Sequence, residues 1–197
     1  MKTRQNIALA VVLLLTALAP TAAAQEKSPA AFDVAPRAGS DGSVVQRQPD
    51  VAYGAGVYLA AWSSGSRDAD HPACEIRCGR IDAKTLKPLD EEGIVICPPG
   101  DLREWPAVAF DGSNFLVVWQ DFRSHKHYDI YAARVSPEGK VLDAGGFVVA
   151  AQACNQARPK VAFAGGNFVV AWVDARVYPV YGIYAARVSP EGKVIDG

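Results

Sequence analysis

The sequence has little excess charge of either sign and no apolar run long enough for a membrane span. It carries 20 Lys and Arg residues against 21 Asp and Glu residues, a net charge of −1 at pH 7. Because nucleic-acid-binding proteins usually carry a basic excess, this balance argues against a nucleic-acid partner. The apolar run at residues 7–19 is shorter than the roughly 20 residues that cross a bilayer. We therefore predict neither a nucleic-acid nor a membrane partner for the mature protein.

The N-terminus has the features of a secretory signal peptide. Lys2 and Arg4 precede the apolar run, and Ala22-Ala23-Ala24 follows it. A basic start, a short apolar stretch and small residues at the end are typical of a cleaved leader. We predict a leader at residues 1–24 and an exported chain, secreted or periplasmic. An uncleaved membrane anchor is the alternative.

Cysteine is scarce, and its four positions suggest a disulfide in an exported chain. Cys74 and Cys78 are four positions apart on an expected strand, where their Cα atoms would lie about 13 Å apart. A disulfide needs less than about 7 Å, so these two should not pair with each other. The preferred pair is Cys78 with Cys97, and Cys74 with Cys97 is second. The rival interpretation is a metal site of Cys74, Cys78 and His71, although that spacing is not a standard zinc knuckle.

The strongest signal is internal repetition. The segment Ile130–Val141 recurs unchanged as Ile183–Val194, 53 residues later. Upstream, Trp105–Phe110 matches Arg158–Phe163, and a more distant copy begins at Gln48. No window of adequate length outside the leader carries an apolar period of 3.6 residues, so no helix is expected.

Each copy is predicted to form four antiparallel strands. In the second copy the first strand follows Pro106 and the second covers Phe115–Trp119. The third lies around Ile130–Val135, and the fourth is Gly146–Ala150. Phe115–Trp119 is apolar on both faces, which is typical of a strand covered on both sides. Four strands at a period near 50 residues predict the blade of a β-propeller, because such a sheet must stack against copies of itself.

The repeat pattern resembles that of a known family. The pattern P-x-V-A-F-x-G-x-N-F-x-V-x-W-x-D-x-R, followed by I-Y-A-A-R-V-S-P-E-G-K-V, resembles the tandem propeller repeats of secreted bacterial proteins, grouped with sialidase-like propellers. The resemblance covers residues 46–197 and implies an all-β partial propeller of about three blades. The sialidase Asp-box S-x-D-x-G-x-x-W is absent, so the resemblance brings no catalytic residues with it.

We divide the chain by these repeats. A leader at 1–24 precedes an N-terminal extension at 25–46, which contains a spare strand at Ala31–Ala35. The blades are expected at 47–104, 105–157 and 158–197, and the third is incomplete. The spare strand would complete or mimic a fourth strand. Two interpretations stay open: a homodimer that closes a six-bladed ring, or a truncated fragment of a larger propeller.

One polar motif recurs at the end of the second strand of each blade. It reads Trp-x-Asp-x-Arg in the last two copies and degrades in the first, where Trp62 remains. It is either structural, with Trp packed between blades and Asp paired with Arg, or a ligand-binding ring for sugar or another polar ligand. The candidate ligand contacts are Trp119, Asp121, Arg123, Trp172, Asp174 and Arg176.

Few polar groups break the repeat symmetry, as a catalytic site should. Asp68 and Asp70 are candidates either to bind a cation such as Ca²⁺ or to form a catalytic carboxylate pair, and His125 and His127 are candidates to bind a metal ion. Neither pair has an obvious third ligand, so no cofactor is expected. We predict a non-catalytic module that binds carbohydrate or a surface protein. The alternative is a sialidase-like or other glycoside hydrolase.

Overall fold

The computed structural model describes residues 33–34, 44–66 and 73–196. Within these ranges the regular structure consists of eleven β-strands, and no helix is long and apolar enough to cross a membrane. The predicted leader and the loop that holds Asp68 and Asp70 lie outside the described residues. So does most of the predicted spare strand, of which Asp33 and Val34 are described and are not part of a strand.

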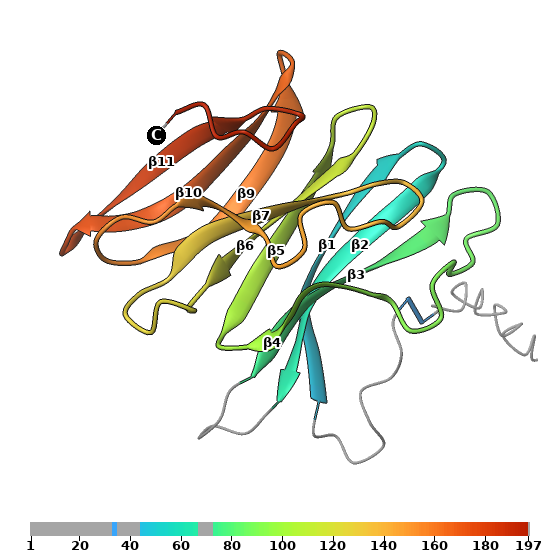
Figure 1. The fold of residues 1–197 in the computed structure, drawn as a ribbon, viewed down its shortest axis with the longest axis horizontal. Helices are drawn as coiled ribbons and strands as arrows, with labels where there is room; N and C mark the ends of the chain where they lie inside the picture. The colour runs from blue at the N-terminus through green and yellow to red at the C-terminus, as the bar shows by residue number, and fades with distance from the viewer. Residues whose placement is uncertain (1–32, 35–43, 67–72, 197) are drawn as a thin grey trace, which may run out of the picture. The chain divides into compact units, whose positions relative to one another are not determined.

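Three antiparallel sheets follow one another along the chain (Figure 1). The first sheet has the order β1 (Val44–Gly54), β2 (Val57–Ser66), β3 (Cys74–Asp82), β4 (Ile94–Gly100). The second has the order β5 (Arg103–Phe110), β6 (Phe115–Asp121), β7 (Asp129–Val135), β8 (Phe147–Ala150). This arrangement confirms the predicted all-β fold of four-stranded antiparallel units.

The third sheet has three strands. They are β9 (Gln156–Ala164), β10 (Asn167–Val177) and β11 (Val180–Val188), with β10 in the centre. Gly165 and Gly166 join β9 to β10 with φ angles of +60° and +80°. Two positive φ values give a turn whose twist matches that of the paired strands. β11 is an edge strand among the described residues.

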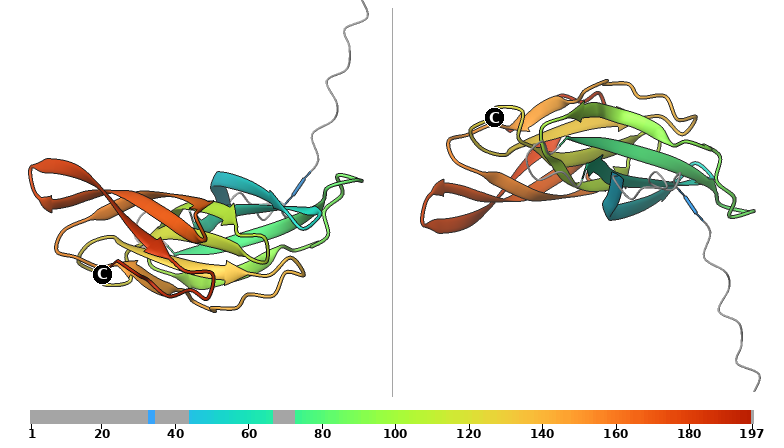
Figure 2. Two further views of the ribbon diagram at one scale, coloured as in Figure 1. Left: turned by 90° about the horizontal axis from the view of Figure 1, so that it is seen from above. Right: turned by 90° about the horizontal axis from the view of Figure 1, so that it is seen from below.

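The sheets pack face to face, and this packing forms the core. In each sheet we call the side that carries the motif tryptophan (Trp62, Trp119 or Trp172) the Trp flank. The opposite side carries Arg80, Arg134 or Arg187 on the third strand, and we call it the Arg flank. Leu59 and Ile76 on the Arg flank of the first sheet pack against the Trp flank of the second. The Arg flank of the second sheet packs likewise against the Trp flank of the third. Figure 2 shows the first and third sheets at opposite ends of this row.

Because the second sheet is covered on both sides, all seven residues of β6 are buried. This confirms the prediction that Phe115–Trp119 is covered on both faces. Burying one large apolar side chain contributes about 1.5–3 kcal/mol to stability. The stability of each sheet therefore depends on its neighbours.

A bulge recurs in the first strand of every sheet. Gln48, Trp105 and Arg158 have φ angles of +56°, +55° and +54°, and each precedes a proline. The proline and the residue before it together face one tryptophan of the next strand, where the ladder shifts its register. Proline is tolerated in sheets at bulges because it has no N–H for the ladder. A bulge also redirects the neighbouring side chain.

Two adjacent glycines allow a test of the packing around Trp119. Gly145 and Gly146 have φ angles of +77° and +80°, but only a Cβ atom at Gly146 would meet the Trp119 ring, at 2.4 Å. We expect Gly146→Ala to destabilise the protein more than Gly145→Ala, by about 1–3 kcal/mol. Both variants carry similar backbone strain, so the difference measured by urea unfolding isolates the steric clash. Equal losses would contradict this packing.

Candidate functional site

The repeated Trp-x-Asp-x-Arg motif is buried between sheets. Asp121 and Asp174 are 0% and 1% exposed. In the second and third copies the indole Nε1 donates to the aspartate Oδ2 atom over 2.9 Å, and the arginine two positions later donates to the same carboxylate. Each motif arginine also lies 3.9 Å from the centre of a tyrosine ring, that of Tyr131 or Tyr184. These contacts occupy the two carboxylates within the chain.

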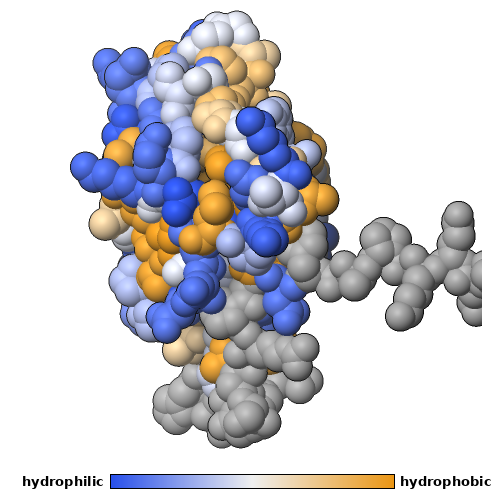
Figure 3. Space-filling model, turned by 90° about the vertical axis from the view of Figure 1, so that its right-hand side faces the viewer, coloured by the Kyte–Doolittle hydropathy of each residue, from blue (hydrophilic) through white to orange (hydrophobic). Residues whose placement is uncertain are grey.

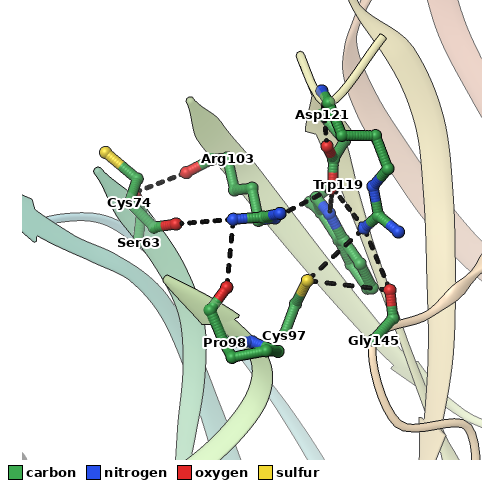
Figure 4. Close-up of polar contacts among 9 residues, drawn as sticks. Ser63, Cys74, Cys97, Pro98, Arg103, Trp119, Asp121 and Gly145 are labelled. Atoms are coloured by element: carbon green, nitrogen blue, oxygen red, sulfur yellow. Dashed lines mark hydrogen bonds and ion pairs between the residues drawn. The ribbon is translucent and has the colours of Figure 1, made fainter. Parts of the chain in front are cut away.

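Asp121 has an additional partner that links two sheets. Arg103 donates from Nε to Asp121 over 3.2 Å and from Nη1 to the carbonyl oxygens of Cys74 and Pro98 in the first sheet (Figure 4). The hydroxyl of Ser63 donates to the Arg103 carbonyl over 2.8 Å. Burial acts to raise the pKa of Asp121, but hydrogen bonds from Arg123 and Trp119 outweigh it and lower the pKa. Asp121 is therefore held as a carboxylate that joins the sheets.

The other two copies of the motif have fewer contacts. Burial acts to raise the pKa of Asp174, and hydrogen bonds from Arg176 and Trp172 lower it to about 2. The stabilising effect of this carboxylate is therefore complete above the ordinary aspartate pKa and is lost as the pH falls toward 2. In the first sheet Ser64 takes the place of the aspartate, and the Nε1 atom of Trp62 is buried without a hydrogen-bond partner among the described residues.

The two candidate histidines contact different carboxylates. The Nδ1 atom of His127 is 3.1 Å from Asp129, and that of His125 is 3.3 Å from Asp101. Burial raises the pKa of the Asp129 carboxyl. Among the described residues no group of three His, Cys, Asp or Glu side chains is placed to hold a metal ion. The candidates Asp68, Asp70 and His71 lie outside these residues.

The four cysteines are free thiols in the structure, so the expected disulfide between Cys78 and Cys97 is not formed. The strand register explains the difference. Cys97 faces Ile76 across the β3–β4 ladder, whereas Cys78 faces Ile94. Cys74, Cys78 and Cys97 are buried, and Cys154 is exposed.

A pocket of about 520 Å³ lies between the second and third sheets, beside their first strands. The repeated bulge brings Trp105 and Arg158 into it from equivalent positions of β5 and β9. The Arg158 guanidinium lies 5.2 Å from the centre of the Trp105 ring. The pocket is lined by Glu104, Trp105, Gln120, Tyr128, Asn155, Ala157, Arg158, Val173 and Tyr181.

Glu104 is the carboxylate of this pocket. Its Oε2 atom accepts hydrogen bonds from Gln120 Nε2 over 3.2 Å and from the Tyr128 hydroxyl over 3.3 Å. Burial and the neighbouring Glu104 charge raise the pKa of Tyr128 to about 12. The phenol therefore remains a hydrogen-bond donor over the physiological pH range.

The loop and strand ends around Glu104 are tied to the third sheet. The backbone N–H of Tyr128 donates to Asn155 Oδ1 over 2.9 Å, and the N–H of Gln156 donates to the Tyr128 carbonyl over 2.8 Å. The Gln120 side chain also accepts a hydrogen bond from the Arg158 N–H over 2.9 Å. The polar groups of the pocket are thus fixed by contacts that cross from one sheet to the next.

This arrangement combines flat apolar surface with fixed polar groups. Trp105 is 40% exposed and Tyr181 is 64% exposed, so both rings can contact a ligand. Aromatic rings stack on the apolar faces of sugars, and carboxylate, amide and guanidinium groups bind hydroxyls. The pocket is chemically suited to a polyhydroxylated ligand.

The residues of this pocket were not predicted from the sequence. The predicted sites lie where loops break the repeat symmetry, whereas the structure places different side chains at one repeated strand position. Gln48, Trp105 and Arg158 all precede the proline of the repeat, a signal that was visible in the sequence. What the sequence did not reveal is the positive φ angle that turns these side chains.

Comparison with family models gives no match, and comparison with curated proteins gives none. Solved structures do resemble the chain. An alpha-L-arabinofuranosidase from Lactobacillus brevis has a TM-score of 0.53 at 11% identity, covering 78% of this chain and 56% of that chain. An endo-arabinase from Bacteroides thetaiotaomicron VPI-5482 has a TM-score of 0.52 at 16% identity, covering 81% of this chain and 66% of that chain.

The fold is a partial β-propeller. The structural neighbours are β-propeller proteins, and this chain spans a little over half the length of the first of them. At such low identities the likeness shows the fold alone. It supports the propeller predicted from the repeats without supporting sialidase-like repeats in particular.

The unequal contacts of the motif aspartates predict unequal losses of stability. We expect Asp121→Asn to destabilise the protein by about 3 kcal/mol, because it leaves the buried Arg103 guanidinium without its anionic partner. Asp174→Asn should cost less, since its partner Arg176 is partly exposed. Asp196→Asn, in an exposed ion pair with Arg187, is the control and should have the smallest effect. Equal free energies of unfolding for the three variants would refute this order.

The burial of the thiols predicts their reactivity. Burial raises the pKa of the Cys78 thiol to about 12 and also raises that of Cys97. In native protein we expect a disulfide reagent such as dithionitrobenzoate to modify one thiol per chain, Cys154, and to reach the other three only in denaturant. Cys154→Ser should remove the native reaction. Fewer than four thiols in the denatured, unreduced protein would reveal a disulfide.

Proposed function

We propose that this chain is an exported, non-catalytic β-propeller module that binds carbohydrate. The ligand site is the pocket between the second and third sheets, with the Trp105 ring as its stacking surface. The single observation that carries this proposal is the convergence of Trp105, Glu104 and Arg158 on one pocket. In this proposal the buried Trp-x-Asp-x-Arg motifs hold the sheets together and do not contact the ligand.

The structural neighbours support the ligand class. Two of them are named as an alpha-L-arabinofuranosidase and an endo-arabinase, so two proteins of similar fold act on arabinose-containing carbohydrate. The polar groups of the pocket match such a ligand, because sugar hydroxyls both donate and accept hydrogen bonds. Glu104 supplies an acceptor, and Arg158 supplies donors.

A glycoside hydrolase, sialidase-like or of another class, is the second candidate. Glu104 favours it, because Tyr128 and Gln120 hold this carboxylate at the pocket. Glycoside hydrolysis usually needs two carboxylates flanking the scissile bond. Among the described residues that line the pocket, Glu104 is the one carboxylate, which favours binding over hydrolysis. A fragment of a larger propeller is a third interpretation, since the chain spans 56% of the first neighbour.

Binding to soluble arabinan, measured by affinity electrophoresis and calorimetry, tests the proposal. We expect the protein to bind, and we expect Trp105→Ala to weaken binding about tenfold by removing the stacking surface. Tyr178→Ala is the matched control, because this exposed aromatic residue does not line the pocket. Its binding should equal that of the unmodified protein.

A panel of fluorogenic glycosides distinguishes binding from hydrolysis. The proposal expects no turnover. Turnover that is lost in Glu104→Gln would establish the hydrolase instead. If neither arabinan nor the other polysaccharides of a panel bind, the carbohydrate proposal is wrong.

A further inference from the structure

The same inter-sheet contact is built twice within the chain. Arg80 forms an ion pair with Asp90 at 2.7 Å and donates from Nη1 to the Pro137 carbonyl of the second sheet, over 3.2 Å. One repeat later, Arg134 pairs with Asp143 at 2.8 Å and donates to the Pro190 carbonyl of the third sheet, over 3.3 Å. Each arginine thus fixes the turn of the next sheet.

The turn approaches closely because it ends in glycine. A Cβ atom at Gly139 would lie 2.9 Å from Arg80 Nε, and one at Gly192 would lie 3.0 Å from Arg134 Nε. Both glycines have positive φ angles, of +87° and +85°. The second and third copies of the repeat therefore supply the glycine turn, whereas the turn of the first copy, at residues 82–87, contains no glycine and has Leu86 with a φ angle of +54°.

The third sheet carries the first half of this contact and, among the described residues, no second half. Arg187 pairs with Asp196 at 2.7 Å, but this pair is 52% and 42% exposed, against 19% and 13% for Arg80 and Asp90. The hydrogen bonds of its side chain all go to Asp196. The Arg187 guanidinium is thus placed to receive a turn that no described segment supplies.

The apolar surface around Arg187 is uncovered as well. Val169 is 39% exposed and Ile183 is 75% exposed, whereas Leu116 and Ile130, their equivalents in the second sheet, are fully buried. These residues belong to the Arg flank of the third sheet. In the first two sheets, the Arg flank is covered by the Trp flank of the sheet that follows.

The first sheet offers the complementary surface at the other end of the row. On its Trp flank Val51 is 56% exposed and Tyr53 is 60% exposed, while Val108, the equivalent of Val51, is buried. Figure 3 views the molecule from this end and shows hydrophobic surface between hydrophilic side chains.

The aromatic pair of this flank matches those inside the interfaces. Tyr53 packs on Tyr58 with ring centroids 5.2 Å apart, as Phe110 packs on Phe115 at 4.6 Å and Phe163 on Phe168 at 5.0 Å.

Another part of this flank is occupied within the chain. Asp33 and Val34 lie beside Trp62, at a pocket of about 290 Å³ that Val51 and Tyr53 do not line.

We propose that the Arg flank of the third sheet docks on the Trp flank of the first sheet of a second copy of this chain. Three observations select this partner. The interface would continue one that exists twice within the chain, its two halves are flanks whose described residues expose apolar side chains, and the Tyr53–Tyr58 pair matches the aromatic pairs of the two existing interfaces. In the first sheet, Ala83 holds the position in the repeat that Pro137 holds in the second, so its carbonyl would face Arg187.

Such an interface is head-to-tail, because the two flanks differ. A head-to-tail interface forms a closed ring if its rotation closes. Two copies would supply six sheets, within the usual four to eight of a propeller. The carbohydrate pocket lies inside one chain, so this assembly and the proposed function can fail independently.

Sedimentation velocity of the full chain tests the proposal with two single variants. The unmodified protein should sediment as a dimer. Ile183→Glu on the third sheet and Tyr53→Glu on the first should each raise the dimer dissociation constant at least about tenfold. Both side chains are exposed in one chain, so circular dichroism and melting temperature should stay unchanged.

Mixing the two variants distinguishes the proposed geometry from symmetric pairing. The Tyr53→Glu chain keeps an intact third sheet, and the Ile183→Glu chain keeps an intact first sheet. Together they should form a dimer through one intact interface. Leu142→Glu is the control, because Leu142 stays 37% exposed in a sheet covered on both flanks, and it should leave the assembly unchanged.

Each opposite result overturns the proposal. A chain that is monomeric at every accessible concentration has no such interface. A dimer that persists in Ile183→Glu uses another surface. A mixture that remains monomeric while both variants stay folded excludes head-to-tail docking.

Discussion

Face-to-face burial of sheet flanks is the constraint on which this structure depends. A four-stranded sheet with apolar residues on both sides exposes two hydrophobic surfaces unless neighbours cover them. The second sheet has two neighbours, and every residue of β6 is buried. The first and third sheets have one neighbour each among the described residues, and their outer flanks expose Tyr53 and Ile183.

The repeated polar groups serve this packing. Asp121 accepts from Trp119, Arg123 and Arg103 without reaching solvent, and Arg103 extends the network into the first sheet. Burying one charge alone is costly, so the pairs must form together with the interface. This coupling accounts for the near-identity of the motif in the last two copies, where each aspartate lies beneath a neighbouring sheet. The first copy has Ser64 instead of the aspartate, and its tryptophan N–H has no hydrogen-bond partner in the described part of the chain.

The sequence predicted the fold well because period, turns and strands all repeat. The strands at Phe115–Trp119 and Ile130–Val135 were predicted within a residue or two, and their burial follows from composition. The site was predicted poorly for a physical reason: Trp105 and Arg158 meet only after two sheets stack and two bulges turn their side chains. The disulfide expectation failed on register, because Cys97 faces Ile76 on the neighbouring strand. Strand order can be predicted from repeats, but the register of a ladder with bulges cannot.

Residues that repeat between the copies and residues that differ therefore lie at different kinds of position in this fold. Positions that face a neighbouring sheet must repeat, because every interface needs side chains of the same complementary shape and the same paired charges. The residue before the bulge proline differs from copy to copy: Trp105 and Arg158 line the pocket, whereas Gln48 Oε1 accepts a hydrogen bond from the Trp105 N–H over 2.9 Å. Gln48, Trp105 and Arg158 share φ angles within 2° of one another and share nothing in chemistry. A repeat that fixes the backbone of one position and leaves its side chain open provides a row of equivalent places at which a binding site can be assembled.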